Sequence, residues 1–163
     1  MNLTLEEQLV SRLIEKGWHV SCAESCTGGL IAASIVNVAN ASRVLDVSFV
    51  TYANEAKTKY LGVHPETIAT FDVVSEPVVA QMAKGVANEA GSEVGIATSG
   101  VAGPSGGTDE IPVGTVCFGF YIHGTVTTST MQFGNVGRNE VRALSTEYAL
   151  KTAIQLIKER SLL

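Results

Sequence analysis

The sequence predicts an α/β protein, a three-layer α/β/α sandwich around a mixed, largely parallel sheet. Short apolar segments alternate with stretches of helical periodicity along most of the chain, as in sheets whose strands are joined by helices. Two β-rich segments then follow each other across His123-Gly124, which is typical of an antiparallel hairpin. With 163 residues, of which 45% are hydrophobic and 17% charged, we expect one domain over residues 1–163 with a substantial core.

The expected elements of the first half begin and end at recognisable residues. Thr4 and Glu7 form a capping-box pattern, and apolar residues at helical spacing predict a helix that ends at Gly17. Asn54 is a candidate cap for a short helix, and Pro65 marks the beginning of another turn or helix. The remaining patterns predict strands over 18–23 and 47–52 and helices over 27–36 and 54–61.

The second half is divided by a glycine-rich loop. Ser75-Glu76-Pro77 is a helix-start pattern, and an apolar run that ends at Ser99-Gly100 predicts a buried strand. Residues 100–112 hold four glycines and two prolines and are expected to form a loop. The patterns predict a helix over 75–90, strands over 94–98, 113–122 and 125–133, and a last helix over 139–159.

Composition and charge narrow the function classes. No apolar run reaches the roughly 18 residues that span a bilayer, and the N-terminus lacks a signal-peptide pattern, so we expect a cytoplasmic protein without membrane contact. The net charge of −5 gives no electrostatic reason to expect a nucleic-acid partner. Cys22, Cys26 and Cys117 follow neither a disulfide framework nor a zinc-ligand spacing, so we expect a reducing compartment and no metal.

The most informative segment is AESCTGG at residues 23–29, where a strand gives way to a helix. Ser25 lies at the carboxyl end of the expected strand, the usual ligand edge of an open α/β sheet, and is a candidate nucleophile. Gly28 and Gly29 allow a ligand to approach closely, and free N–H groups of the turn at Thr27 suit a phosphate or an oxyanion. Glu24 is a candidate for orienting the site, with a solvated strand end as the alternative.

Two other interpretations of this segment stay open. Ser25 and Thr27 are equally well explained as helix caps, with Cys26 as a core residue. Cys26 is also a rival nucleophile, but no histidine obviously pairs with it. Each of the three histidines is better explained as structural: His19, His64 and His123. A serine nucleophile therefore needs a base other than histidine.

The segment FVTYANEAK at residues 49–57 offers such a base. Lys57 falls in the first turn of the helix that Asn54 would cap, where the helix dipole disfavours the ammonium form. Tyr52, at the end of the preceding strand, is a candidate proton partner. The alternative is a solvent-facing helical lysine, which is the common state of an isolated lysine.

Two later segments are candidates for binding an anion. The loop SGVAGPSGG at residues 99–107 offers N–H groups that suit a phosphate or a carbonyl, or else is an ordinary long connection. It lacks the Gly-Lys-Ser/Thr of a nucleoside-triphosphate loop. Arg138 stays open as a phosphate ligand, whereas Arg142 is expected to pair with Glu140 and Glu147 on a solvated face.

Together these segments resemble the CinA C-terminal-domain family, whose characterised members are nicotinamide-nucleotide amidohydrolases. The resemblance covers about residues 8–158 and rests on six segments in the same order. They are AESCTGG at 23–29, FVTYANEAK at 49–57, LGV at 61–63, VSEPVV at 74–79, SGVAGPSGG at 99–107 and PVGTVCF at 112–118.

The resemblance implies hydrolysis of nicotinamide mononucleotide (NMN) to nicotinate mononucleotide and ammonia, without a metal or cofactor. It implies Ser25 as the nucleophile, Lys57 as the base and Tyr52 as a proton partner. It also implies the stand-alone form of the family and a homo-oligomer, most simply a dimer. The expected substrate-binding residues are Glu24, Thr27, Gly28, Gly29, Ser99, Gly100, Gly103, Gly106 and Arg138.

The chain departs from the family pattern at two places. Val47-Ser48 stands where the family usually has Arg-Gly, and residues 134–138 read GNVGR in place of Gly-Asp-Arg. Two alternatives to an active deamidase therefore stay open. One is a catalytically silent relative that binds a pyridine nucleotide or a protein partner, and the other is a hydrolase of another small amide.

Overall fold

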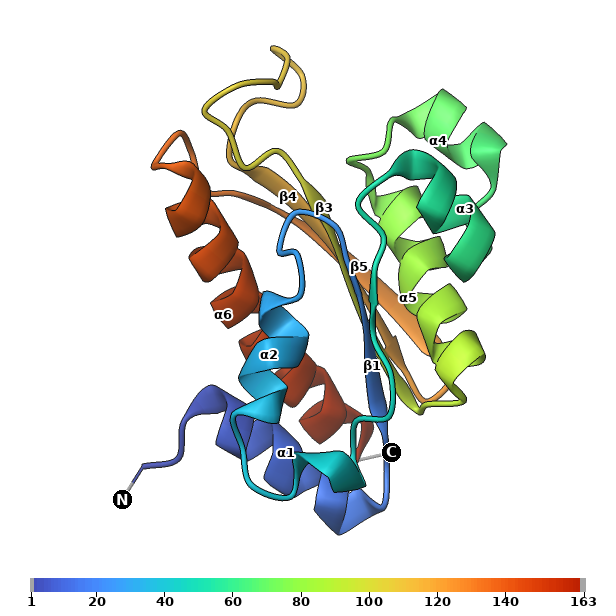
Figure 1. Ribbon diagram of the computed structural model, residues 1–163, viewed down its shortest axis with the longest axis vertical. Helices are drawn as coiled ribbons and strands as arrows, with labels where there is room; N and C mark the ends of the chain where they lie inside the picture. The colour runs from blue at the N-terminus through green and yellow to red at the C-terminus, as the bar shows by residue number, and fades with distance from the viewer. Residues whose placement is uncertain (1, 162–163) are drawn as a thin grey trace.

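The computed structural model describes residues 2–161, and a five-stranded mixed sheet forms its centre (Figure 1). The strands are β1 (Val20–Glu24), β2 (Phe49–Val50), β3 (Val94–Gly100), β4 (Thr115–Ile122) and β5 (Thr125–Gln132), in the spatial order β2-β1-β3-β4-β5. The pairs β1–β2 and β1–β3 are parallel, and the pairs β3–β4 and β4–β5 are antiparallel. The sheet therefore joins a parallel half to an antiparallel hairpin.

Helices cover both faces of the sheet (Figure 1). One face carries α1 (Leu5–Lys16), α2 (Leu30–Val36), the short 3₁₀ helix η1 (Ala41–Arg43) and α6 (Arg138–Arg160). The other face carries α5 (Glu76–Ala90), with α3 (Asn54–Leu61) and α4 (Pro65–Phe71) packed beside it. This is the predicted three-layer α/β/α arrangement.

The hydrophobic core has one part on each face of the sheet. Under α1, α2 and α6, buried side chains such as Leu13 and Ile31 pack against Phe118 and Phe120 of β4. Under α5, the core includes Met82. The central strand β1 is buried along its whole length, as expected of a strand covered on both faces. The parallel part of the sheet is therefore packed on both sides.

Most predicted boundaries are confirmed. Thr4 and Glu7 make both hydrogen bonds of the capping box, and Gly17 ends α1 with a φ of 66°. The last helix and the hairpin across His123-Gly124 lie where the pattern placed them. Two elements are shorter than predicted: α2 begins at Leu30, and the strand expected over 47–52 pairs with the sheet only at β2.

The carboxyl ends of the three parallel strands meet at one end of the sheet, at the top of Figure 1. The turn over 25–29, the segment over 51–53 and the loop over 101–114 all leave the sheet there. The first residues of α3, α5 and α6 lie at the same end (Figure 1). Within residues 2–161, no helix has the length and apolar character needed to cross a bilayer.

Candidate active site

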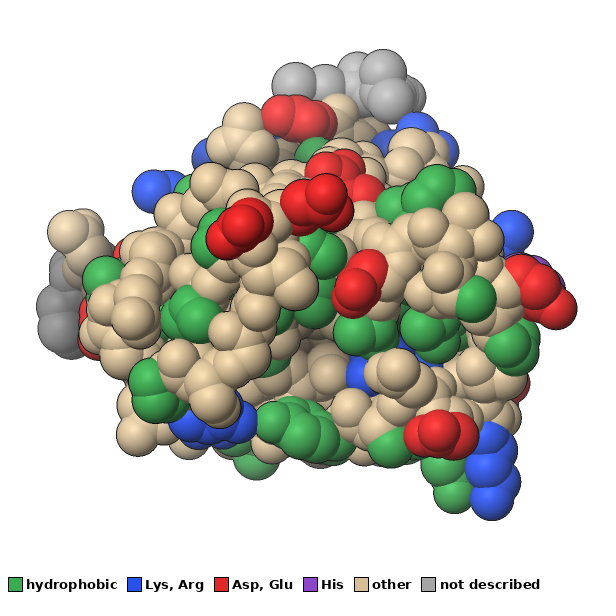
Figure 2. Space-filling view, turned by 90° about the horizontal axis from the view of Figure 1, so that it is seen from above, with side chains coloured by type: hydrophobic (Ala, Val, Ile, Leu, Met, Phe, Trp, Pro, Cys, Tyr) green, Lys and Arg blue, Asp and Glu red, His purple; other side chains and the backbone are tan. Residues whose placement is uncertain are grey.

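A cavity of about 350 Å³ opens at this end of the sheet, a size typical of small-molecule sites. Figure 2 looks onto this end of the molecule and shows the surface hollowed near its centre. The lining comes from the ends of all three parallel strands, from the segment before α5 and from the start of α6. The lining residues are 25–26, 52, 54, 57, 72–74, 99–103, 105–108, 111 and 138.

Ser25 lies in this lining on backbone that is bonded to the sheet. Ser25 is the first residue after β1, and its N–H donates to the carbonyl oxygen of Thr98 on β3 at 3.2 Å. Its own carbonyl accepts from the N–H of Gly28 at 3.1 Å, which closes a tight turn. Ser25 is 8% exposed, so its hydroxyl reaches the cavity from a fixed position.

Lys57 lies beside Ser25 and is only 1% exposed. Its Nζ is 2.9 Å from Ser25 Oγ. The same atom lies 2.6 Å from the carbonyl oxygen of Thr51 and 3.2 Å from that of Tyr52. No carboxylate among residues 2–161 forms a salt bridge with it. Burial without such a partner lowers the pKa of the Lys57 amine from 10.5 to about 8.

The contacts of Lys57 suit both protonation states of its amine. Nζ is surrounded by two carbonyl acceptors and one hydroxyl, so an ammonium donates to all three. A neutral amine donates its two N–H groups to Thr51 and Tyr52, and its lone pair is then free to accept from the Ser25 hydroxyl. Ser25 and Lys57 are therefore placed as a candidate nucleophile and its candidate general base.

Cys26 also lines the cavity, but its chemistry differs from that of a nucleophile. Burial raises the pKa of the Cys26 thiol to about 11, so the thiol stays protonated near neutral pH. Within the described residues its backbone N–H has no hydrogen-bond acceptor. This N–H is therefore the candidate donor to an oxyanion that forms at Ser25.

Glu24 does not line the cavity and is fully buried. Its carboxylate oxygens accept from the N–H groups of Ile31 at 2.9 Å and Ala32 at 3.0 Å, in the first turn of α2. Glu24 therefore holds α2 against the end of β1, and the predicted contact of Glu24 with substrate is not supported. It also occupies two of the N–H groups that a bound anion would need at this helix terminus.

Thr27, Gly28 and Gly29 lie outside the cavity lining as well. Thr27 is fully buried, and its hydroxyl lies 2.9 Å from that of Thr98. Gly28 and Gly29 have φ values of 58° and 104°, which suit glycine and delay the start of α2. These residues shape the turn that carries Ser25, and the predicted binding of substrate by them is not supported.

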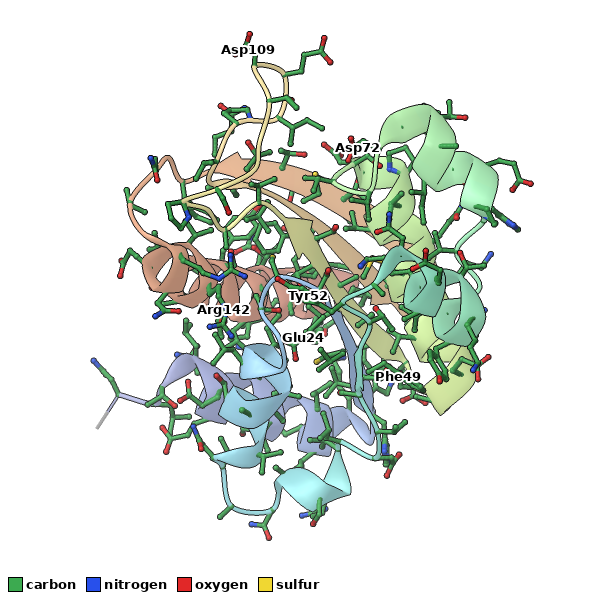
Figure 3. All side chains as sticks on the ribbon, turned by 45° about the horizontal axis from the view of Figure 1, so that its top comes forward. Glu24, Phe49, Tyr52, Asp72, Asp109 and Arg142 are labelled. Atoms are coloured by element: carbon green, nitrogen blue, oxygen red, sulfur yellow. The ribbon has the colours of Figure 1, made fainter. Side chains whose placement is uncertain are left out.

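Arg142 corrects another prediction. In place of pairing with Glu140 and Glu147, its Nε donates to the carbonyl oxygen of Cys26 at 3.0 Å. Its Nη2 donates to the carbonyl oxygen of Thr27 at 3.3 Å. Figure 3 shows Arg142 reaching from α6 toward the end of β1. A charged donor on two successive carbonyls fixes the orientation of the turn after Ser25.

Tyr52 and Arg138 meet at the mouth of the cavity. Arg138 donates through Nη2 to the hydroxyl of Tyr52 and through Nη1 to the carbonyl oxygen of Gly103, both at 2.9 Å. Tyr52 is 61% exposed and contacts Lys57 through its backbone carbonyl. A proton relay through its hydroxyl stays a prediction. Arg138 lies where a guanidinium can bind an anion over the opening.

The glycine loop forms one wall, and the predicted residues Ser99, Gly100, Gly103 and Gly106 all line the cavity. The hydroxyl of Ser99 donates to the carbonyl oxygen of Val73 at 2.9 Å, which joins the end of β3 to the segment before α5. A Cβ atom at Gly100 would lie 2.7 Å from Cγ2 of Val116 on β4, so only glycine fits there without a displacement of β4.

Several lining residues were not predicted from the sequence, among them Asn54, which was expected only as a helix cap, and Asp72. Arg142 lies outside the lining, and its position did have a signal, because its spacing from Arg138 puts both on one helix face. Among residues 2–161, no group of three or more His, Cys, Asp or Glu side chains is placed to hold a metal ion.

Comparison with known proteins identifies the family of the chain. The profile described as the CinA C-terminal domain matches residues 2–157. The chain belongs to this family. A CinA-superfamily structure from Klebsiella pneumoniae, 36% identical, superposes with a TM-score of 0.91 over 95% of this chain and 96% of that one. The three-layer fold is therefore that of solved CinA proteins.

Curated relatives in the CinA family differ in length. A protein from Enterobacter agglomerans named nicotinamide-nucleotide amidohydrolase PncC is 47% identical over 152 residues, which are 93% of this chain and 92% of that protein. A CinA-like protein from Kosmotoga olearia is 46% identical over 147 residues, which are 90% of this chain. The match covers 35% of that relative, so the chain spans about a third of its length.

The two departures from the CinA family pattern leave the cavity's charged residues in place. Ser48 accepts a hydrogen bond from the N–H of Cys22 at 2.9 Å and so supports β1, while Val47 is exposed. Gly137, with a φ of 107°, immediately precedes α6. Arg138 follows it and still reaches the cavity.

Proposed function

We propose that this protein is an amidohydrolase that converts NMN and water to nicotinate mononucleotide and ammonia. The observation that carries the proposal is the 2.9 Å contact between Lys57 Nζ and Ser25 Oγ, made by a lysine whose pKa lies near 8. The similarity to a relative named nicotinamide-nucleotide amidohydrolase, over nearly the whole of both chains, supports the choice of substrate.

The first half of the reaction forms an ester on Ser25. Ser25 Oγ attacks the carboxamide carbon as its proton passes to the Lys57 amine. The carbon–nitrogen bond then breaks, and the same proton passes from Lys57 to the departing nitrogen, which leaves as ammonia. During the attack, the N–H of Cys26 donates to the developing oxyanion.

The second half releases the acid. A water molecule takes the place of ammonia, gives a proton to Lys57 and attacks the ester carbon. The bond to Ser25 Oγ then breaks, and Lys57 returns the proton to that oxygen. One water is consumed and one ammonia is released. The Lys57 amine and the Ser25 hydroxyl end as they began.

The remaining cavity residues hold the nucleotide. Arg138 is the candidate ligand of the substrate phosphate, since it lies at the mouth and its guanidinium suits bidentate binding of phosphate oxygens. The N–H groups of the glycine loop, residues 99–107, are further candidate donors. Arg142 contributes indirectly, because it fixes the turn that carries Ser25 and Cys26.

The test is ammonia release from NMN by the purified chain, with nicotinate mononucleotide identified by chromatography. Ser25→Ala is expected to reduce turnover by at least about 10³-fold, the scale seen when a nucleophile is removed. Ser34→Ala is the matched control, because Ser34 lies on α2, outside the cavity lining, and its hydroxyl donates to the carbonyl oxygen of Leu30. It is expected to leave turnover unchanged.

Two outcomes would contradict the proposal. A folded wild-type chain that releases no ammonia from NMN would exclude this activity. A Ser25→Ala variant that keeps more than a tenth of the wild-type rate would keep the activity but remove Ser25 as its nucleophile. Circular dichroism of each variant separates loss of chemistry from loss of folding.

A further inference from the structure

Asp72 adopts a backbone conformation that residues with a side chain rarely take. Its φ is 74° and its ψ is 158°, a region occupied almost entirely by glycine. It follows α4 directly, between Phe71 and the segment that leads to α5. Backbone outliers of this kind are concentrated at active sites and ligand-binding sites.

Asp72 lies in the cavity lining together with Val73 and Val74. Its Oδ1 atom accepts from the N–H of Val74 at 3.2 Å. Within residues 2–161, no Lys, Arg or His side chain forms a salt bridge with it, and its Oδ2 atom receives no hydrogen bond. The negative charge of Asp72 is therefore not neutralised by the protein.

The charges of the cavity are arranged in opposition. Of the described lining residues, the charged ones are Lys57, Asp72 and Arg138, and Asp72 is the one carboxylate among them. Asp72 comes from the α4–α5 side, and Arg138 comes from α6 on the other side of the sheet (Figure 1). A ligand that spans the cavity thus meets an anion on one side and a cation on the other.

We propose that Asp72 is a specificity-determining residue that selects substrates with a cationic pyridinium ring. This inference rests on the proposed function and refines it. In NMN the ring nitrogen is bonded to ribose and carries a fixed positive charge, while the phosphate is negative. Asp72 attracts the ring and repels the phosphate, and Arg138 does the reverse. The two residues together orient the nucleotide so that its carboxamide, attached to the ring, is presented to Ser25.

A purely structural role for Asp72 makes a different prediction. The bond from Oδ1 to the N–H of Val74 stabilises the turn before α5, and an amide oxygen accepts this bond as well as a carboxylate does. Asp72→Asn therefore keeps the turn and removes the charge. Asp109→Asn is the matched control, because Asp109 lies outside this cavity lining, on the part of the loop over 101–114 that extends away from the sheet (Figure 3).

The test compares NMN with its reduced form, which has the same carboxamide, ribose and phosphate but an uncharged dihydropyridine ring. Asp72→Asn is expected to lower kcat/KM for NMN by about three- to fivefold, mainly through KM, the upper range of an exposed charge pair. It is expected to leave kcat/KM for the reduced form within about twofold. The difference between the two substrates is expected to shrink as salt rises. Asp109→Asn is expected to change neither value.

If Asp72→Asn lowered kcat/KM equally for NMN and for its reduced form, or for neither, the proposed role of Asp72 would be overturned. The same comparison by equilibrium binding to Ser25→Ala and to Ser25→Ala/Asp72→Asn keeps the test independent of turnover. There, equal preference for NMN over its reduced form in both proteins would overturn it. Absence of ammonia release by the wild type would contradict the proposed function alone, since the binding comparison still reports on Asp72.

Discussion

The inner part of the cavity and its mouth are built differently. At the inner part, Ser25 and Lys57 are buried. The backbone of Ser25 is bonded to β3, and Lys57 is bonded to Thr51, whose own N–H donates to the end of β1. At the mouth, Tyr52, Asp72 and Arg138 are exposed and held mainly by single contacts between loops and helix ends. Under the proposed function, this difference corresponds to two roles: the inner part performs amide cleavage at fixed geometry, and the mouth selects and orients the nucleotide.

The largest effect on turnover is expected from removal of the base in the inner part. Lys57→Met keeps an unbranched side chain of similar length but has no amine, and it is expected to lower kcat for NMN by about 10³-fold or more. Lys59→Met is the control, because Lys59 lies exposed on the same helix and contacts Tyr60. Steady-state ammonia release measures both. A rate above a tenth of wild type in Lys57→Met would show that another group takes the proton.

The second prediction concerns pH. Since the pKa of Lys57 is lowered to about 8, the amine is mostly protonated at pH 6.5 and mostly neutral at pH 9. A base acts in its neutral form, so kcat/KM is expected to rise with pH about tenfold per unit below pH 8 and to level off above it. A profile that is flat from pH 6.5 to 9, or that falls, would contradict the assignment. Asp72→Asn is expected to leave the midpoint in place.

The third prediction concerns Arg138 at the mouth of the cavity. Arg138→Met is expected to raise KM for NMN roughly tenfold and to change kcat little, because it removes a charged hydrogen bond to the phosphate. Nicotinamide riboside, which has the same carboxamide and no phosphate, is the matched substrate. Its kinetic constants are expected to be unchanged by the substitution. An equal loss on both substrates would show that Arg138 supports the site through Tyr52 and Gly103 instead.

Local sequence predicted the two catalytic candidates because both follow from strand topology. Ser25 and Lys57 come just after neighbouring parallel strands, and the carboxyl ends of such strands meet at one edge of a sheet. Their 2.9 Å contact therefore required only the correct order of elements. The glycine loop after β3 reached the cavity for the same reason.

The sequence did not reveal the contacts that depend on how a side chain turns. Glu24 was a candidate substrate ligand, but its carboxylate folds back onto N–H groups seven and eight residues ahead. Arg142 had an acidic neighbourhood along its own helix, yet it bonds to carbonyls more than a hundred residues away in the chain. In both cases the position of the side chain is explained by the backbone groups that it satisfies, because carbonyl and N–H groups inside the protein need partners.

The sequence also did not predict two features of the backbone conformation. Phe71-Asp72-Val73 contains neither glycine nor proline, so nothing in its letters indicates a residue with positive φ. The charge that this residue brings to the cavity became visible only with the fold. Likewise, the strand expected over 47–52 shortened to β2, which frees Thr51 and Tyr52 to offer their carbonyls to Lys57.

The most direct measurement of the central claim is the mass of Ser25 during a single turnover. Excess protein is mixed with NMN, quenched within milliseconds to seconds and digested, and the peptide that contains Ser25 is examined by mass spectrometry. We expect a transient ester of the nicotinate nucleotide on Ser25 that forms as ammonia appears and decays as nicotinate mononucleotide is released. Product that forms within the first turnover without any adduct on Ser25, at every time sampled, would contradict the account and indicate direct attack by water.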